Sequence, residues 1–99
     1  MAGVILFEWD AAKARADARK HGVNFEDAML VFSDPYASVE QDRIEGSEPR
    51  WQTIGLVGDV VILVVAHTVR EQGEDEIIRI ISARKATRRE QNLYRESRL

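Results

Sequence analysis

The sequence predicts an α+β protein, in which helices pack against a sheet built mainly from antiparallel strands. Three observations carry this prediction: a short apolar segment is followed by two capped helical segments, a block of strands separated by turns comes next, and a capping box opens a last helix. Helices and antiparallel strands are thus segregated along the chain, which is typical of α+β folds. With 99 residues, the chain is expected to form one domain over residues 1–99.

A strand and a helix are predicted first. Val4–Phe7 is short, apolar and β-branched at two positions, which indicates a strand. The carboxylate of Asp10 can accept hydrogen bonds from the first turn of a helix over residues 11–20. Gly22 follows where a left-handed residue commonly ends a helix. The sequence therefore predicts a capped helix directly after the strand.

A second, shorter helix follows with its own cap. Asn24 is a good N-cap, and Phe25, Met29 and Phe32 recur at helical spacing behind it. Pro35 cannot continue the helix. The expected helix is therefore short and amphipathic.

Most of the remaining chain is expected to be β-structure. Glycine and polar clusters separate runs of β-branched and aromatic residues. The expected strands are 36–41, 51–57, 60–69 and 76–84, with a loop over 42–49, a tight turn at Gly58-Asp59 and a loop over 70–75. Thr87 and Glu90 have the spacing of a capping box, which predicts a last helix over residues 88–98.

Composition excludes several classes of protein. The chain has no cysteine, so no disulfide framework, zinc–thiolate cluster or thiol nucleophile is available. The longest apolar run, 60–66, is far below the ~20 residues that span a bilayer. The first residues lack a basic segment typical of a signal peptide. We therefore expect a cytoplasmic protein without a membrane partner.

Charge is unevenly distributed along the chain. Residues 1–78 hold 7 basic and 15 acidic side chains, a net charge of −8, whereas residues 79–99 hold 7 basic and 2 acidic side chains, a net charge of +5. Clustered basic residues favour phosphate binding more than the total of −3 indicates. The alternative is a basic helix face that is simply solvated.

Arg79 and His67 interrupt apolar strands. A guanidinium between four isoleucines needs either a polar cleft or an acidic partner. If the 70–75 loop closes an antiparallel hairpin, the numbers of any two residues that face each other add to about 145 or 146. A sum of 146 places His67 opposite Arg79, at a Cβ separation of ~5 Å. His67 is then either a general acid or base, or a hydrogen-bonded residue at the end of a strand.

Other candidate residues each allow two interpretations. Trp9 and Trp51 can stack on unpaired bases or pack in the core. Glu90 is a possible acid–base group, although the capping box already explains it. Two histidines 46 positions apart, without a thiol, make a poor metal site. No metal or other cofactor is therefore expected.

Six fragments in one order resemble the BrnT family of bacterial type II toxins. They are Phe7-Glu8-Trp9-Asp10, Lys20-His21-Gly22-Val23-x-Phe25-Glu26-x-Ala28, Val31-Phe32-x-Asp34-Pro35, Arg50-Trp51-x-x-Ile54-Gly55, Val64-Val65-x-His67-Thr68-x-Arg70 and Arg79-Ile80-Ile81-Ser82-Ala83-Arg84-x-Ala86-x-x-x-Glu90-x-x-x-Tyr94. The resemblance runs from about Leu6 to Tyr94, nearly the whole chain.

The resemblance implies a RelE/ParE-like fold, with two N-terminal helices and a C-terminal helix beside a twisted sheet. It also implies a metal-independent endoribonuclease that arrests growth by cutting RNA. The implied partner is a BrnA-type antitoxin with a ribbon-helix-helix module, through which the complex would bind operator DNA.

The residues fit this implied chemistry. Arginine binds phosphate oxygens with a planar fork that stays charged. We expect Arg70, Arg79 and Arg84 to hold the scissile phosphate and His67 to transfer a proton. The expected substrate-binding residues are Trp51, Lys85, Arg88 and Tyr94.

Two other functions are compatible with the same sequence. One is a non-catalytic binding or co-repressor module of a toxin–antitoxin complex. The other is a gyrase inhibitor similar to ParE. His67 and the arginines of the last two strands favour the ribonuclease over both.

Overall fold

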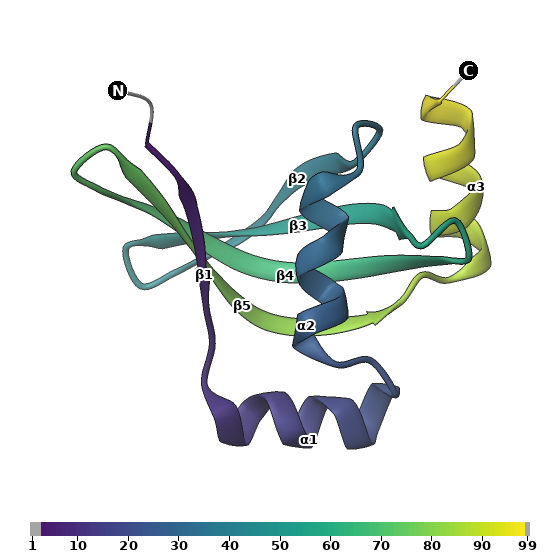
Figure 1. The fold of residues 1–99 in the computed structure, drawn as a ribbon. Helices are drawn as coiled ribbons and strands as arrows, with labels where there is room; N and C mark the ends of the chain where they lie inside the picture. Colours follow the sequence, from purple (N-terminus) through teal and green to yellow (C-terminus); the bar gives the residue numbers. More distant parts are fainter. Residues whose placement is uncertain (1–2, 99) are drawn as a thin grey trace.

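The helices and strands follow the order that the sequence predicts (Figure 1). A computed structural model describes residues 3–98, except for the side chain of Glu45. The elements are β1 (Ile5–Glu8), α1 (Ala11–His21), α2 (Phe25–Ala28), the 3-10 helix η1 (Met29–Ser33), β2 (Ser38–Glu45), β3 (Glu48–Val57), β4 (Val61–Gln72), β5 (Asp75–Lys85) and α3 (Arg88–Ser97). The α+β prediction, with two N-terminal helices and one C-terminal helix, is confirmed.

The predicted caps fix the two N-terminal helices. The Asp10 side chain accepts a hydrogen bond from the Lys13 amide, and Gly22 ends α1 with a left-handed φ of 72°. The Asn24 side chain accepts from the Asp27 amide at the start of α2. The second helix then tightens into η1, so its apolar residues reach the sheet along a 3-10 turn.

One five-stranded sheet forms the body of the protein, in the order β1-β5-β4-β3-β2. β1 pairs in parallel with β5, and the other neighbouring strands are antiparallel. β4 lies in the middle and is buried from Ile62 to Thr68. The prediction that this apolar strand is covered on both faces is confirmed for that stretch.

The sheet has two differently covered faces. On the first, which we call the α1–α2 face, Leu63, Val65 and Ile80 pack with Phe25 and Val31. On the second, the α3 face, alternate residues of β4 pack against α3. That smaller cluster contains Ile62, Val64, Ala86 and Tyr94. In Figure 1, α3 stands at the opposite end of the sheet from the tip of the β4–β5 hairpin.

Two predicted loops are wrong. Residues 42–49 form most of a hairpin, since β2 runs to Glu45 and β3 starts at Glu48. Residues 70–75 are likewise mostly strand, with Gly73 and Glu74 as the turn between Gln72 and Asp75. Both segments are polar because they lie in exposed hairpin ends, where charged residues do not need to be buried. The turn at Gly58-Asp59 is confirmed, with φ values of 61° and 56°.

A β-bulge in β5 changes which residues share a face. Thr68 pairs with Arg79, and His67 pairs with Ile80, so both predicted registers are wrong. On the other side of the bulge, Ala66 pairs with Ser82, which leaves Ile81 as an extra residue. An extra residue reverses the alternation of side chains beyond it.

No helix within residues 3–98 is long and apolar enough to cross a lipid bilayer.

Candidate functional site

Arg70 and Arg79 are joined by one carboxylate, that of Glu8. Arg70 Nη2 lies 2.7 Å from Glu8 Oε1, and Arg79 Nη1 lies 2.7 Å from Glu8 Oε2. The backbone builds this arrangement, because Glu8 is the pairing partner of Arg79 in the β1–β5 ladder. The acidic partner that the sequence leaves open for Arg79 is therefore the last residue of β1.

This cluster stays accessible and charged. The side chains of Arg70 and Arg79 are 48% and 44% exposed, and that of Glu8 is 34% exposed. The hydrogen bonds from Arg70 and then Arg79 lower the pKa of Glu8 below its usual value, so the carboxyl is ionised at neutral pH. Each guanidinium has five N–H donors, and Glu8 engages only some of them. Donors therefore remain for an anion from solvent.

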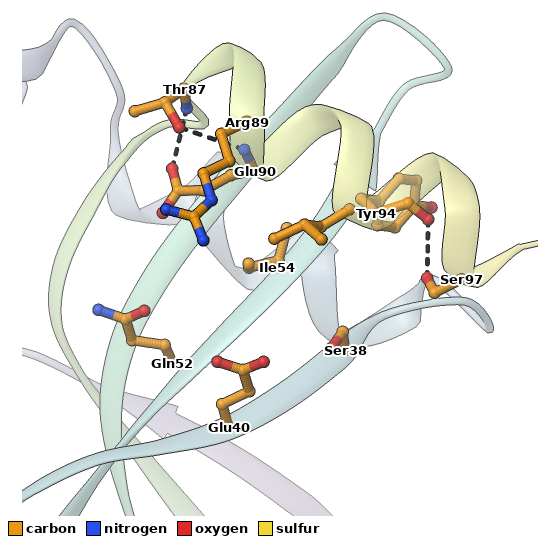
Figure 2. A pocket seen from close by; sticks show the side chains of 10 residues that line it. Ser38, Glu40, Gln52, Ile54, Thr87, Arg89, Glu90, Tyr94 and Ser97 are labelled. Carbon is orange, nitrogen blue, oxygen red and sulfur yellow. Dashed lines mark hydrogen bonds between the residues drawn. The ribbon is translucent and has the colours of Figure 1, made fainter.

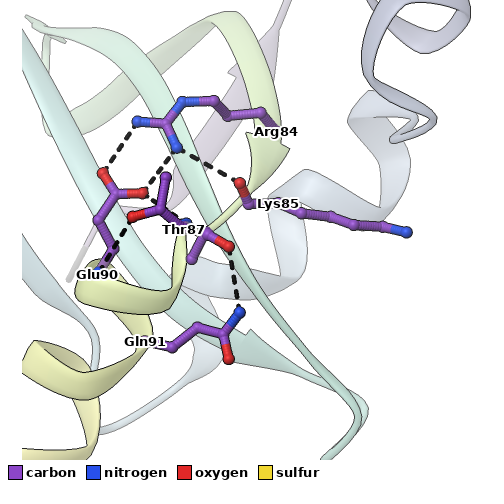
Figure 3. A network of polar contacts seen from close by, with 6 residues as sticks. Arg84, Lys85, Thr87, Glu90 and Gln91 are labelled. Carbon is purple, nitrogen blue, oxygen red and sulfur yellow. Dashed lines mark hydrogen bonds and ion pairs between the residues drawn. The ribbon is translucent and has the colours of Figure 1, made fainter.

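Arg84 lies on the same face as this pair but has its own partner. Its Nη1 and Nη2 donate to Glu90 Oε1 and Oε2 at 2.7 and 2.9 Å (Figure 3). Glu90 also accepts from the Thr87 amide, which completes the predicted capping box. The hydrogen bonds from Arg84 are the main reason that the pKa of Glu90 falls to about 2. Glu90 is thus a fixed carboxylate that joins α3 to β5.

The bulge brings Arg84 to the face on which the backbone positions of Arg70 and Arg79 already lie. The pairing partners on β4 establish this arrangement, because Thr68 pairs with Arg79 and Val64 pairs with Arg84. These partners and Arg70 itself are separated by even numbers of residues along one strand, so all three positions face the same way. Arg79 and Arg84 are about 13 Å apart along the sheet, since a strand rises ~3.3 Å per residue.

A groove runs beside these residues, between α3 and the strands β2 and β3. Its volume is about 490 Å³. Figure 2 shows Gln52 and Glu40 on the strand side and Arg89 and Glu90 on the helix side. The groove therefore continues the polar surface of the α3 face toward the basic helix.

His67 lies on the opposite face. It is 2% exposed, and its Nε2 lies 2.7 Å from Thr53 Oγ1. Its ring packs edge-on against the ring of Phe32, with 4.9 Å between the two ring centroids. Burial lowers the pKa of His67, so its neutral form is favoured. Among the described residues, no partner bonds its Nδ1. Trp51 pairs with His67 on the same α1–α2 face. Both side chains line a pocket together with Arg70, whereas Arg79 and Arg84 are not among its lining residues.

The other expected substrate-binding residues differ in their exposure to solvent. Lys85 and Arg88 are exposed, at the end of β5 and the start of α3. Tyr94 is only 2% exposed, and its hydroxyl donates to Asp34 Oδ2. Burial and this hydrogen bond raise the pKa of Tyr94 to about 12. Its contacts are those of a residue that fastens α3 to the rest of the protein.

Glu8 is the residue of the cluster that the sequence did not identify. Its only signal in the sequence is that an acidic residue directly follows the apolar residues of a predicted strand. Its importance depends on the parallel pairing of β1 with β5, two strands separated by most of the chain. Within residues 3–98, no group of three or more His, Asp or Glu side chains is arranged to hold a metal ion.

Comparisons with known proteins agree on one family. A family model described as the ribonuclease toxin BrnT of type II toxin–antitoxin systems matches residues 9–90. Among solved structures, the crystal structure of the ribonuclease toxin BrnT from Brucella abortus is similar, with a TM-score of 0.62 and 25% sequence identity. The similarity covers 88% of this chain and 100% of that one. No curated protein sequence matches. The chain belongs to the BrnT family of ribonuclease toxins of type II toxin–antitoxin systems.

Proposed function

We propose that this toxin is a metal-independent endoribonuclease that uses Arg70, Arg79 and Glu8 to cut RNA and arrest growth. The observation that supports it is the pair of half-exposed guanidinium groups held on one carboxylate. Two fixed cations side by side match the charge of a phosphodiester that becomes more negative in the transition state. Arg84, on the same face, is proposed to contact a neighbouring phosphate.

The proposed reaction uses the RNA's own 2′-hydroxyl as nucleophile. The 2′-oxygen forms a bond to phosphorus while the bond from phosphorus to the 5′-oxygen breaks, which leaves a 2′,3′-cyclic phosphate. Glu8 accepts the proton of the 2′-hydroxyl, and the leaving 5′-oxygen takes a proton from water. Arg70 and Arg79 bind the non-bridging oxygens by charge-assisted hydrogen bonds.

The remaining expected residues have different places in this proposal. Lys85 and Arg88 are exposed cations near α3 and would bind the RNA backbone outside the cleaved linkage. The roles expected for His67, Trp51 and Tyr94 stay predictions. His67 and Tyr94 are buried, and Trp51 lies on the α1–α2 face. These positions favour packing or contact with another molecule over contact with the cleaved phosphate.

A type II toxin has a protein antitoxin as its partner, and we propose that this antitoxin is of the BrnA type. Operator DNA would then be bound through the antitoxin's ribbon-helix-helix module. Because the proposed substrate is RNA, we propose that the toxin acts in the cytoplasm. Residues 1–99 would act as one toxin domain.

The test combines growth with product chemistry. Induction in a bacterium is expected to stop growth, and purified protein in EDTA is expected to leave 2′,3′-cyclic phosphate ends on RNA. The Arg79→Ala variant is expected to do neither while remaining folded. Intact RNA together with DNA damage would instead identify a gyrase inhibitor. Growth without RNA cleavage would identify a non-catalytic module. Either result would overturn the proposal.

A further inference from the structure

An apolar pocket opens on the α1–α2 face, away from Arg79 and Arg84, and Arg70 is one of its lining residues. Its volume is about 540 Å³, within the range of cavities that hold a ligand or a partner's side chains. Phe32 from η1, Trp51 from β3 and Val69 from β4 are among its lining residues, and Val39 from the edge strand β2 lines it as well. Val39 is 58% and Val69 is 37% exposed. Apolar side chains exposed around a concave surface mark a contact site.

Carboxylates surround this pocket on one side. Glu71 and Glu76 both line it, and they face each other directly across the β4–β5 ladder. Like charges at directly opposed positions destabilise a strand pair. Glu74 and Asp75 follow in and after the turn, so four acids lie within six positions. Among the side chains that the structure describes, the ion pairs join other residues, and none involves Glu71 or Glu76.

This charge selects against RNA and in favour of a cationic partner. Arg70 also lines the pocket, but the charged lining residues Arg70, Glu71 and Glu76 together carry a net charge of −1, and Arg70 itself donates to Glu8. A polyphosphate chain would meet two uncompensated carboxylates here, whereas lysine or arginine side chains would relieve their repulsion. The apolar wall requires that the same partner also carries an apolar side chain to bury.

We propose that this pocket binds a segment of the protein antitoxin in which an apolar side chain is flanked by lysine or arginine. The apolar side chain packs between Phe32, Trp51 and Val69, and its basic neighbours pair with Glu71 and Glu76. This inference rests on the family's antitoxin partner and does not depend on the catalytic roles proposed for the arginines. It places one antitoxin contact on the face opposite to Arg79 and Arg84, in a pocket that Arg70 also lines.

The first test uses two exposed positions of the same strand. Val39→Lys puts a bulky cation into the pocket, while the control Ile44→Lys changes a residue that is 61% exposed and outside it. Lysine is well tolerated on edge strands, so both variants are expected to fold. With purified antitoxin of the same operon as the probe, Val39→Lys should weaken calorimetric binding by about tenfold or more, as like charges across an interface do. Ile44→Lys should bind as the wild type does.

The second test concerns the acids. Joint replacement of Glu71 and Glu76 by lysine should weaken binding and remove most of its dependence on salt. Both this variant and Val39→Lys should retain RNA cleavage, and in cells they should stay toxic when the antitoxin is co-expressed. Failure of the proposed cleavage chemistry would instead be seen in the wild type without antitoxin, so the two proposals fail separately.

Three results would overturn this inference. One is wild-type antitoxin affinity in Val39→Lys. A second is loss of affinity only when Arg79 is replaced, which would place the antitoxin on the α3 face. The third is a concentration-dependent self-association, measured by sedimentation, that Val39→Lys abolishes without affecting antitoxin binding. That result would assign the pocket to a second copy of the chain.

Discussion

Arg79 and Arg84 lie on the same face of the sheet although five positions separate them along β5. In a regular strand an odd separation places side chains on opposite faces. The unpaired Ile81 between them reverses the alternation, and bulges commonly re-aim side chains near functional sites. The proposed phosphate-binding surface therefore depends on one extra residue in β5.

Asp17 is expected to support this part of β5. β1 pairs with β5 only as far as Arg79, and beyond it the buried Asp17 side chain of α1 accepts a hydrogen bond from the Ala83 amide at 2.9 Å. Asp17→Ala leaves that amide without its partner and should lower the free energy of unfolding by about 1–3 kcal/mol. Chemical denaturation measures the loss. Asp27→Ala, at an exposed position of α2, is the control and should change stability by less than about 0.5 kcal/mol.

Glu90 should make stability depend on acid pH. Its pKa is depressed from 4.5 to about 2 in the folded protein, so its ion pair with Arg84 stabilises the fold above pH 4.5 and loses this effect as the pH falls toward 2. Glu90→Gln keeps a capping-box side chain but loses the charge, and should cost about 1–2 kcal/mol at pH 7.

Thermal unfolding at several pH values measures this effect. The difference between wild type and Glu90→Gln should shrink steadily between pH 4.5 and 2. A difference that is constant across this range would mean that the ion pair contributes nothing to the acid dependence.

Tyr94 is expected to stabilise the attachment of α3. Its buried hydroxyl donates to Asp34, which also accepts from the Leu56 amide at 2.8 Å. Tyr94→Phe removes one donor and should destabilise the protein by about 1–2 kcal/mol in a denaturant titration. Tyr36→Phe, at a side chain that is half exposed, is the matched control. Equal effects of the two variants would argue against a specific role for the Tyr94 hydroxyl.

The pKa of Glu8 should determine the pH below which the cleavage rate falls. Its pKa lies below the usual 4.5 because Arg70 and Arg79 donate hydrogen bonds to it. A Glu8 that acts in its ionised form keeps the cleavage rate constant as the pH falls to 4.5, and the rate drops only below that value. Glu8→Gln should reduce the rate by about 10²-fold or more at neutral pH. Circular dichroism at each pH separates this effect from unfolding.

A different profile would assign the proton transfer elsewhere. Burial lowers the pKa of His67 below its usual 6.5, so a rate that already falls between pH 6.5 and 4.5 would implicate His67 instead.

Local signals predicted most of the fold. Asp10, Gly22, Asn24 and the Thr87–Glu90 box each act within one helical turn, and all of them have their predicted roles. The hairpin ends were missed because the charged residues of 42–45 in β2 resemble a loop when their position at an exposed edge is unknown.

The site was less predictable because it depends on pairing. The turn at Gly73-Glu74 sets which residue faces Arg79, and the bulge at Ile81 sets the face of Arg84; strand alternation alone describes neither. The bond from Glu8 to Arg79 joins the two ends of the chain through a parallel pair. The arginines themselves were identifiable, because a guanidinium between isoleucines needs an explanation that no core provides.

The most direct test is the single-turnover rate at which the purified chain cleaves a short RNA, compared between the wild type and Arg79→Ala. If Arg79 stabilises the charge on the scissile phosphate, its loss should reduce this rate by about 10²–10³-fold with the fold intact. Arg19→Ala, at an exposed arginine of α1, should cleave within about twofold of the wild type. A folded Arg79→Ala variant that cleaves at the wild-type rate would contradict the assignment of this arginine pair as the catalytic centre.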